Sequence, residues 1–173
     1  VGYQAADELT TGGFNTVLGY DALGVADGTE SYNIAIGELA MGSVDHDGAD
    51  NNVGIGYNSL RGGTGELDLC VAIGAYSLDS TGSNDITGGV AVGGYALATL
   101  TSGTENTALG YKAMTSKTTG ARSVAIGYEA EMFNETNGDS TFVGYQAGRG
   151  ASGNTHYHNT GIGSKSLYAV TTG

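Results

Sequence analysis

Several residue types that most globular proteins use are rare in this chain of 173 residues or missing from it. There is no Pro, no Trp, one Cys and only 14% charged residues, while Gly occupies 32 positions. A single cysteine excludes an intramolecular disulfide and a cysteine-based metal cluster. A chain so rich in Gly and so poor in charge is not an ordinary helical domain. No apolar stretch approaches the ~20 residues that a membrane-spanning helix requires.

Positive charge is scarce as well. Six Lys and Arg residues face 18 Asp and Glu residues, the formal net charge is −12, and the first basic residue is Arg61. A surface of this sign repels nucleic-acid phosphates and anionic lipids, so neither nucleic acid nor a membrane is an expected partner. Solubility alone is a sufficient reason for the acidity, because like-charged copies do not adhere to one another.

What the chain does contain is one short pattern written from end to end. The strings NTVLGYDAL at 15–23, NTALGYKAM at 106–114 and NTGIGSKSL at 159–167 share an aliphatic residue followed by Gly. We take this Gly as the anchor of each unit. Ten anchors follow one another with a period of about 18 residues, which varies slightly between units: Gly2, Gly19, Gly37, Gly56, Gly74, Gly93, Gly110, Gly127, Gly144 and Gly163.

Three columns of the repeat hold in all ten units. The residue before the anchor is aliphatic, and the third residue after it is Ala or Ser. A small polar residue precedes a second Gly that lies eight to eleven positions after the anchor. Tyr follows the anchor in six units, and Cys70 replaces the usual Asn four positions before it, which predicts a buried or half-buried thiol.

Each unit therefore predicts one coil of a solenoid. A short run of Val, Ile, Leu, Ala and Tyr bounded by Gly, Asn, Asp, Ser and Thr is typical of a strand between turns. The polar-Gly pairs supply the positive φ that tight turns need. We expect an all-β fold, a parallel β-solenoid or β-roll of ten coils of about 18 residues, with residues 1–173 as a single repeat array. The chain opens within a unit at VGYQAA and closes at TTG, which is typical of a segment of a longer array.

Stacking of the coils restricts which residues particular positions can hold. The anchors should form a ladder in which Gly is needed for positive φ or for the close approach of a neighbouring backbone. Gly110→Val should then cost far more stability than a linker change such as Lys117→Ala. The tyrosines should form a parallel ladder beside the anchors, and the aliphatic residues should lie on the inner face.

The apolar content of one coil also suggests an assembly. One aliphatic column per coil is a sparse core for a single chain, so we predict a homotrimer, intertwined or side by side. Six aliphatic residues should line its shared interior: Ile36, Ile55, Ile73, Val92, Leu109 and Ile126.

The strings NTALGYKAM, SVAIGYEAE and CVAIGAYSL resemble the repeats of bacteriophage tail-fibre and tailspike proteins and those in the heads of trimeric autotransporter adhesins. The resemblance covers all ten units and implies a trimeric shaft. The units of this chain, with Tyr after the Gly, are longer than the adhesin repeat and more similar to the phage repeats. The adhesin head is the alternative.

The resemblance implies a function and a location. It implies a non-enzymatic structural segment that serves attachment to a host cell or surface, placed in a virion or on the extracellular surface. Its partners would be copies of itself and a host cell-surface glycan or receptor.

An enzyme is the rival interpretation. Left-handed β-helix acyltransferases repeat a hexapeptide of an aliphatic residue, Gly, two free positions and a small residue, and IGYNSL at 55–60 fits it. That fold needs three such hexapeptides in each coil, however, and the following RGGTGE and LDLCVA do not fit. A partial motif match has a high false-positive rate. No catalytic constellation emerges from the sequence.

Two short segments carry candidate metal ligands. In DHDGADN, Asp45, Asp47, Asp50 and Asn51 surround a turn Gly, and such oxygen ligands suit Ca²⁺, although an acidic solvated turn gives the same pattern. His156 and His158 form an H-x-H pair in the linker before the last anchor. The resemblance to trimeric phage fibres implies that such pairs can meet at the axis and hold a transition metal, whereas a linker position favours exposure to water. Apart from this candidate calcium, no cofactor is predicted.

Overall fold

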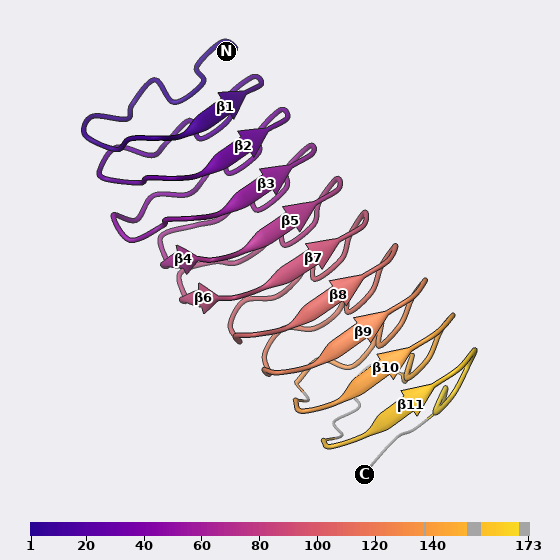
Figure 1. Cartoon of the computed structure of the whole chain (residues 1–173). Helices are drawn as coiled ribbons and strands as arrows, with labels where there is room; N and C mark the ends of the chain where they lie inside the picture. Colours follow the sequence, from indigo (N-terminus) through magenta and orange to yellow (C-terminus); the bar gives the residue numbers. More distant parts are fainter. Residues whose placement is uncertain (137, 152–156, 170–173) are drawn as a thin grey trace.

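The apolar run before each anchor folds as a strand of three residues, and successive strands lie side by side along one stack (Figure 1). The structure, a computed structural model, describes residues 1–136, 138–151 and 157–169. Its strands are β1 (Thr16–Leu18), β2 (Ile34–Ile36), β3 (Val53–Ile55), β4 (Leu67–Asp68), β5 (Val71–Ile73), β6 (Ile86–Thr87), β7 (Val90–Val92), β8 (Thr107–Leu109), β9 (Val124–Ile126), β10 (Thr141–Val143) and β11 (Thr160–Ile162). The described residues include no helix, so none is long and apolar enough to cross a membrane.

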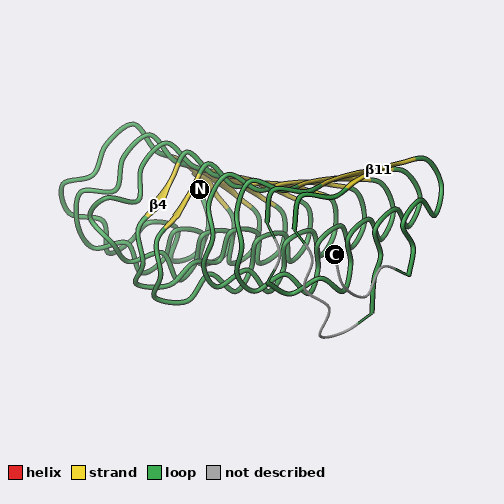
Figure 2. Ribbon diagram, turned by 90° about the horizontal axis from the view of Figure 1, so that it is seen from below, coloured by secondary structure: helices red, strands yellow, loops and turns green. Residues whose placement is uncertain are grey.

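Nine of these strands form one parallel sheet in the order β1-β2-β3-β5-β7-β8-β9-β10-β11. Equivalent positions of the repeat pair throughout, so that Ile36 lies opposite Ile55 and Ile55 opposite Ile73. β4 and β6 pair in a second, two-stranded parallel sheet. Loops and turns close the rest of each coil, and the strands line one side of the stack (Figure 2). The predicted all-β parallel solenoid is confirmed.

Alternation along each strand decides which side chains the coil encloses. The middle residue points inward and is small and buried in most strands, as at Ala35, Ala72 and Ala108. The residue before the anchor therefore points outward: Ile73 and Leu109 are 38% and 44% exposed. The expectation that this aliphatic column lies on the inner face of the coil is wrong. Successive side chains of a strand point to opposite faces, and the middle residue of each strand is the one that points inward.

Each chain encloses its own core. The Leu or Met four positions after the anchor is fully buried from the second coil to the seventh: Leu23, Met41, Leu60, Leu78, Leu97 and Met114. These side chains join the Ala residues of the strand centres and of the turns in one cluster along the stack. The sparse-core argument for a shared interior therefore does not hold, and the homotrimer stays a prediction that needs a different basis.

The anchors form the expected ladder. The N–H of each anchor from Gly19 to Gly163 donates to the carbonyl of the residue before the preceding anchor, at 2.7–3.0 Å. Both suggested reasons for Gly apply together at Gly110: its φ is +134°, and a Cβ there would lie 2.5 Å from the carbonyl oxygen of Gly127. A side chain at an anchor would therefore push two coils apart.

Left-handed residues other than Gly recur in every complete coil. The second and fourth residues after the anchor have φ near +50° to +60°, for example Tyr95 (φ 60°) and Leu97 (φ 51°). Such conformations are unfavourable for residues with a Cβ. They persist here because each orients an N–H toward a neighbouring coil. Tyr95 N–H donates to Ala75 O at 3.0 Å, and Leu97 N–H to Ala113 O at 3.1 Å.

A column of buried amides accompanies the strands. The side chain of Asn33 accepts from the Asn52 N–H at 2.9 Å and donates to Ala49 O at 2.7 Å. Cys70 takes the next place in this column, where its N–H donates to Asn52 Oδ1 at 2.9 Å and its thiol to Ile86 O at 3.4 Å. The predicted buried thiol is confirmed, and burial raises the pKa of Cys70 to about 11.

Two adjacent glycines allow a matched test of the ladder. In Gly93→Ala the new Cβ would lie 2.6 Å from the carbonyl of Gly110 at a φ of +128°. In Gly94→Ala its nearest neighbour is a Tyr111 ring carbon at 3.5 Å, an ordinary van der Waals contact. We expect Gly93→Ala to lower the free energy of unfolding by about 3–5 kcal/mol and Gly94→Ala by less than about 1 kcal/mol. Urea unfolding measures both, and equal losses would contradict the ladder.

Candidate functional site

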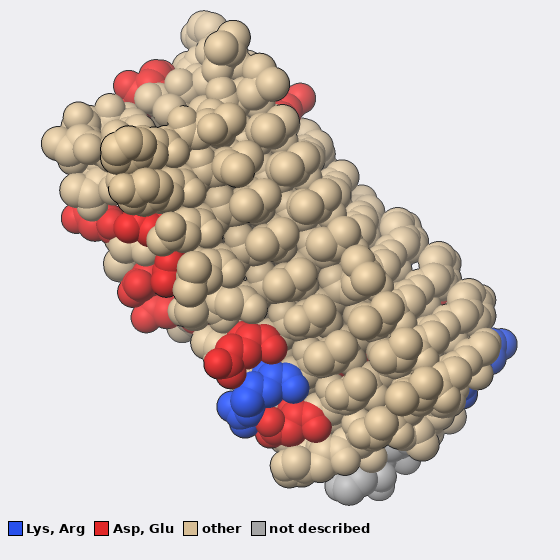
Figure 3. Space-filling view, in the orientation of Figure 1, with Lys and Arg blue, Asp and Glu red and all other residues tan. Residues whose placement is uncertain are grey.

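The outward side of the nine-stranded sheet, here called the outer sheet face, carries no charged residue. Its strands read TVL, IAI, VGI, VAI, VAV, TAL, VAI, TFV and TGI. Figure 3 shows this face as a broad uncharged surface, with charged residues gathered at its edge. An uncharged, largely apolar surface that continues over many coils is a candidate for contact with another molecule.

Two columns of side chains make up the outer sheet face. The first is Thr16, Ile34, Val53, Val71, Val90, Thr107, Val124, Thr141 and Thr160, and the second is Leu18, Ile36, Ile55, Ile73, Val92, Leu109, Ile126, Val143 and Ile162. All six residues predicted to line an interior between chains belong to the second column. They face out of their own coil, as that role requires, and the role itself stays a prediction.

A ladder of tyrosine rings follows the strand ends. Tyr57, Tyr76, Tyr95, Tyr111, Tyr128 and Tyr145 succeed one another with ring centroids 5.0–6.2 Å apart. Tyr3 and Tyr20 form a separate stacked pair at 5.7 Å. The predicted ladder is confirmed and extended, because two of its rings stand one position later in their units. Tyr57–Tyr76 and Tyr95–Tyr111 meet edge to face, and the other three pairs are stacked. Either arrangement stabilises a pair by about 0.5–1.5 kcal/mol beyond area burial.

Charged residues in equivalent positions of consecutive coils also interact. Arg122 forms a two-pronged contact with Asp139 of the next coil, with Nε to Oδ1 at 2.6 Å and Nη2 to Oδ2 at 3.0 Å. These hydrogen bonds hold the pKa of Asp139 below its usual range and raise the pKa of Arg122. Both side chains are largely solvated, so this pair contributes little to stability.

The predicted calcium loop is tied to the preceding coil. Asp47 Oδ1 accepts from the Thr29 N–H at 3.3 Å, and Asp50 Oδ1 accepts from the Ser31 N–H at 2.7 Å. Asn51 donates its N–H to Ser31 O at 3.1 Å. The carboxylates of this loop do not form a common group of ligand atoms, and calcium binding by the predicted set stays a prediction.

The structure instead gathers Asp27, Glu30 and Asp45, of which only Asp45 was in the predicted set. One carboxylate oxygen from each lies within 4.8 Å of the other two. Glu30 is fully buried, and desolvation raises its pKa, with the charges of Asp47 and Asp27 acting in the same direction. Sequence inspection missed this group because its members come from two different coils.

The predicted histidine pair is only partly described. His156 lies outside the described residues. The side chain of His158 is 79% exposed, and its Nε2 lies 3.9 Å from Asp139 Oδ2. Transition-metal binding by this pair stays a prediction.

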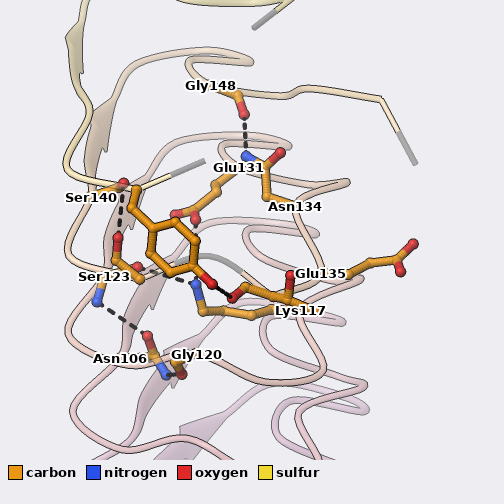
Figure 4. Close-up of polar contacts among 12 residues, drawn as sticks. Asn106, Lys117, Gly120, Ser123, Glu131, Asn134, Glu135, Ser140 and Gly148 are labelled. Carbon is orange, nitrogen blue, oxygen red and sulfur yellow. Dashed lines mark hydrogen bonds and ion pairs between the residues drawn. The ribbon is translucent and has the colours of Figure 1, made fainter. Parts of the chain in front are cut away.

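A buried ion pair occupies the interior of the later coils (Figure 4). Lys117 Nζ lies 3.4 Å from Glu131 Oε1 and donates to Ser123 Oγ at 3.1 Å, and the side chains of Lys117 and Glu131 are fully buried. Burial lowers the pKa of Lys117, and the Glu131 charge opposes that shift. The sequence-based use of Lys117→Ala as a harmless linker change is therefore wrong. In this coil a residue that looked like part of a polar linker turns into the core.

The architecture differs from the prism of the rival acyltransferases. The described residues form one long sheet and one two-stranded sheet, not three sheets of similar length. No pocket is found in the part of the chain that the structure describes. Comparisons with protein-family models, with curated proteins and with solved structures find no match to this chain. The outer sheet face, the tyrosine ladder and the carboxylate cluster are the features of this chain that bear on its function.

The buried ion pair gives a test by double substitution. Lys117→Ala should lower the free energy of unfolding by about 3–5 kcal/mol, because it leaves the Glu131 carboxylate buried without its cation. The double variant Lys117→Leu/Glu131→Met replaces the pair by Leu and Met, the residues buried at the equivalent positions one coil earlier. It should recover most of the lost stability. Urea unfolding of the two single variants and the double variant gives the coupling. Additive losses would show that the two groups do not interact.

Proposed function

We propose that this chain is a structural segment of a fibre, a virion tail fibre or a similar surface appendage, that serves attachment to a host cell or surface. We further propose that it assembles as a homotrimer through the outer sheet face. The observation that carries the proposal is the absence of charge from that face, from β1 to β11, on a chain whose net charge is −12.

The size of the face fits a binding surface. Nine strands about 4.8 Å apart give a length of about 40 Å, and three residues per strand give a width of about 10 Å. The resulting area of about 400 Å² falls in the range of the largest apolar patches on monomers, which are commonly functional. Identical copies meet in closed symmetric arrangements. A threefold axis along the outer sheet faces would bury them while the acidic edges stay in water.

The regular stack supports a mechanical role. Each coil repeats the hydrogen bonds of the previous one, so the chain extends without a flexible joint among the described coils. Differences in length between units are confined to the loops, where a rigid scaffold commonly displays its binding residues. The number of three chains comes from the resemblance to phage fibres, and the adhesin head, the alternative, would use the same assembly.

Light scattering with size-exclusion chromatography tests the assembly. We expect three times the mass of one chain for the parent protein and the mass of one folded chain for Ile73→Glu, because a charge on the outer sheet face prevents burial. Val25→Glu is the matched control: Val25 is as exposed as Ile73, 38% in both, but lies in a loop. It should remain trimeric.

Two outcomes would contradict the proposal. A parent chain that is a stable monomer would exclude the trimer. A trimer that Ile73→Glu leaves intact would show that the copies meet through another surface.

A further inference from the structure

A cluster of three carboxylates joins two consecutive coils near β2. Asp27 and Glu30 come from the coil between β1 and β2, and Asp45 comes from the coil between β2 and β3. One oxygen from each lies within 4.8 Å of the others. Ligand oxygens on a calcium ion lie 2.3–2.6 Å from the metal, so oxygens on opposite sides of one ion are separated by about 5 Å. The spacing therefore fits three ligands of a single cation.

A second observation distinguishes this cluster from an ordinary acidic surface. The Glu30 side chain is fully buried, and its Oε1 has no hydrogen-bond partner among the described residues. Its Oε2 accepts the N–H of Gly28, at 3.1 Å. A buried carboxylate with one oxygen unpaired and no neighbouring positive charge is strongly unfavourable.

No side chain nearby supplies that positive charge. No Lys or Arg precedes Arg61 in the chain. The nearest histidine in sequence, His46, accepts the Gly48 N–H through its Nδ1 at 3.0 Å, which directs this nitrogen's lone pair to the backbone. Asp47 lies close enough to Glu30 to add to the negative charge. The buried charge is therefore removed either by a proton on Glu30 or by a cation from solution.

We propose that Asp27, Glu30 and Asp45 bind one calcium ion that links two consecutive coils. Carboxylate oxygens without nitrogen or sulfur ligands favour a hard cation, and calcium accepts the irregular geometry that loops from two coils provide. Water completes a coordination shell of six to eight oxygens. This proposal is independent of the proposed fibre function.

The test is calcium binding to the whole chain, measured by titration calorimetry and by thermal unfolding after treatment with a chelator. Calcium chloride should bind with one strong site per chain. It should raise the Tm by about 5 °C or more when calcium is in hundredfold excess over the dissociation constant. Magnesium chloride at equal concentration should bind at least tenfold more weakly, because Mg²⁺ demands regular octahedral geometry.

Three variants separate the site from general charge screening. Glu30→Gln should weaken calcium binding at least tenfold and remove the Tm increase. Glu105→Gln is the matched control, since the same charge is removed from an exposed residue many coils away, and it should bind as the parent does. Asp45→Asn removes a ligand that the second coil contributes, at an exposed position, and should also weaken calcium binding. Because Asp45 is exposed, this variant still tests the site if Glu30→Gln does not fold.

The proposal is overturned if the parent chain binds no calcium. It is also overturned if magnesium raises the Tm as much as calcium does, or if Asp45→Asn and Glu105→Gln bind calcium equally well.

Discussion

The contact between backbones at the anchor glycines is the constraint on which the structure depends. Interstrand hydrogen bonds fix the separation of successive coils, and at that separation no Cβ fits between one anchor and the next. Every coil must then have the same outline at the anchor, and its inner side chains must match those above and below. The columns of Ala, Leu and Met follow from this requirement, while the small differences in unit length are absorbed by loops that do not stack so closely.

Features that depend on one position of the repeat could be predicted from the sequence. The anchors and the parallel coils depend on positions repeated at a fixed offset, and so does most of the tyrosine ladder. Tyr76 and Tyr95 stand one position later and fell outside that column. The direction of the aliphatic column could not be predicted, because a strand of three residues shows too little alternation to reveal which face is buried. Left-handed residues such as Leu97 leave no signature, since the neighbouring coil imposes their conformation. The cluster around Glu30 depends on contacts between coils, which spacing within one unit does not reveal.

Polar groups inside the solenoid help to define how the coils are matched. The side chain of Asn33 bonds to two backbone groups of the following coil, and its own N–H donates to Asn15 Oδ1 of the preceding coil, so its position is fixed on both sides. Lys117 occupies the column that Leu100 holds one coil earlier, and Glu131 the column of Met114. A stack displaced by one coil would bury Lys117 without its carboxylate partner, which is costly. An apolar interior of identical units would not distinguish the correct stack from one displaced by a coil.

The direction of the hydrogen bonds between coils has a mechanical consequence. They lie along the long axis, so tension on the two ends loads them directly, and successive coils carry the same force in series. The weakest junction, not the number of units, therefore sets the force at which the rod yields. A junction that opens does not sever the rod, because the covalent chain runs through every coil. Each coil released in this way adds up to about 60 Å of extended chain, so the rod would lengthen in steps and dissipate work before it parts.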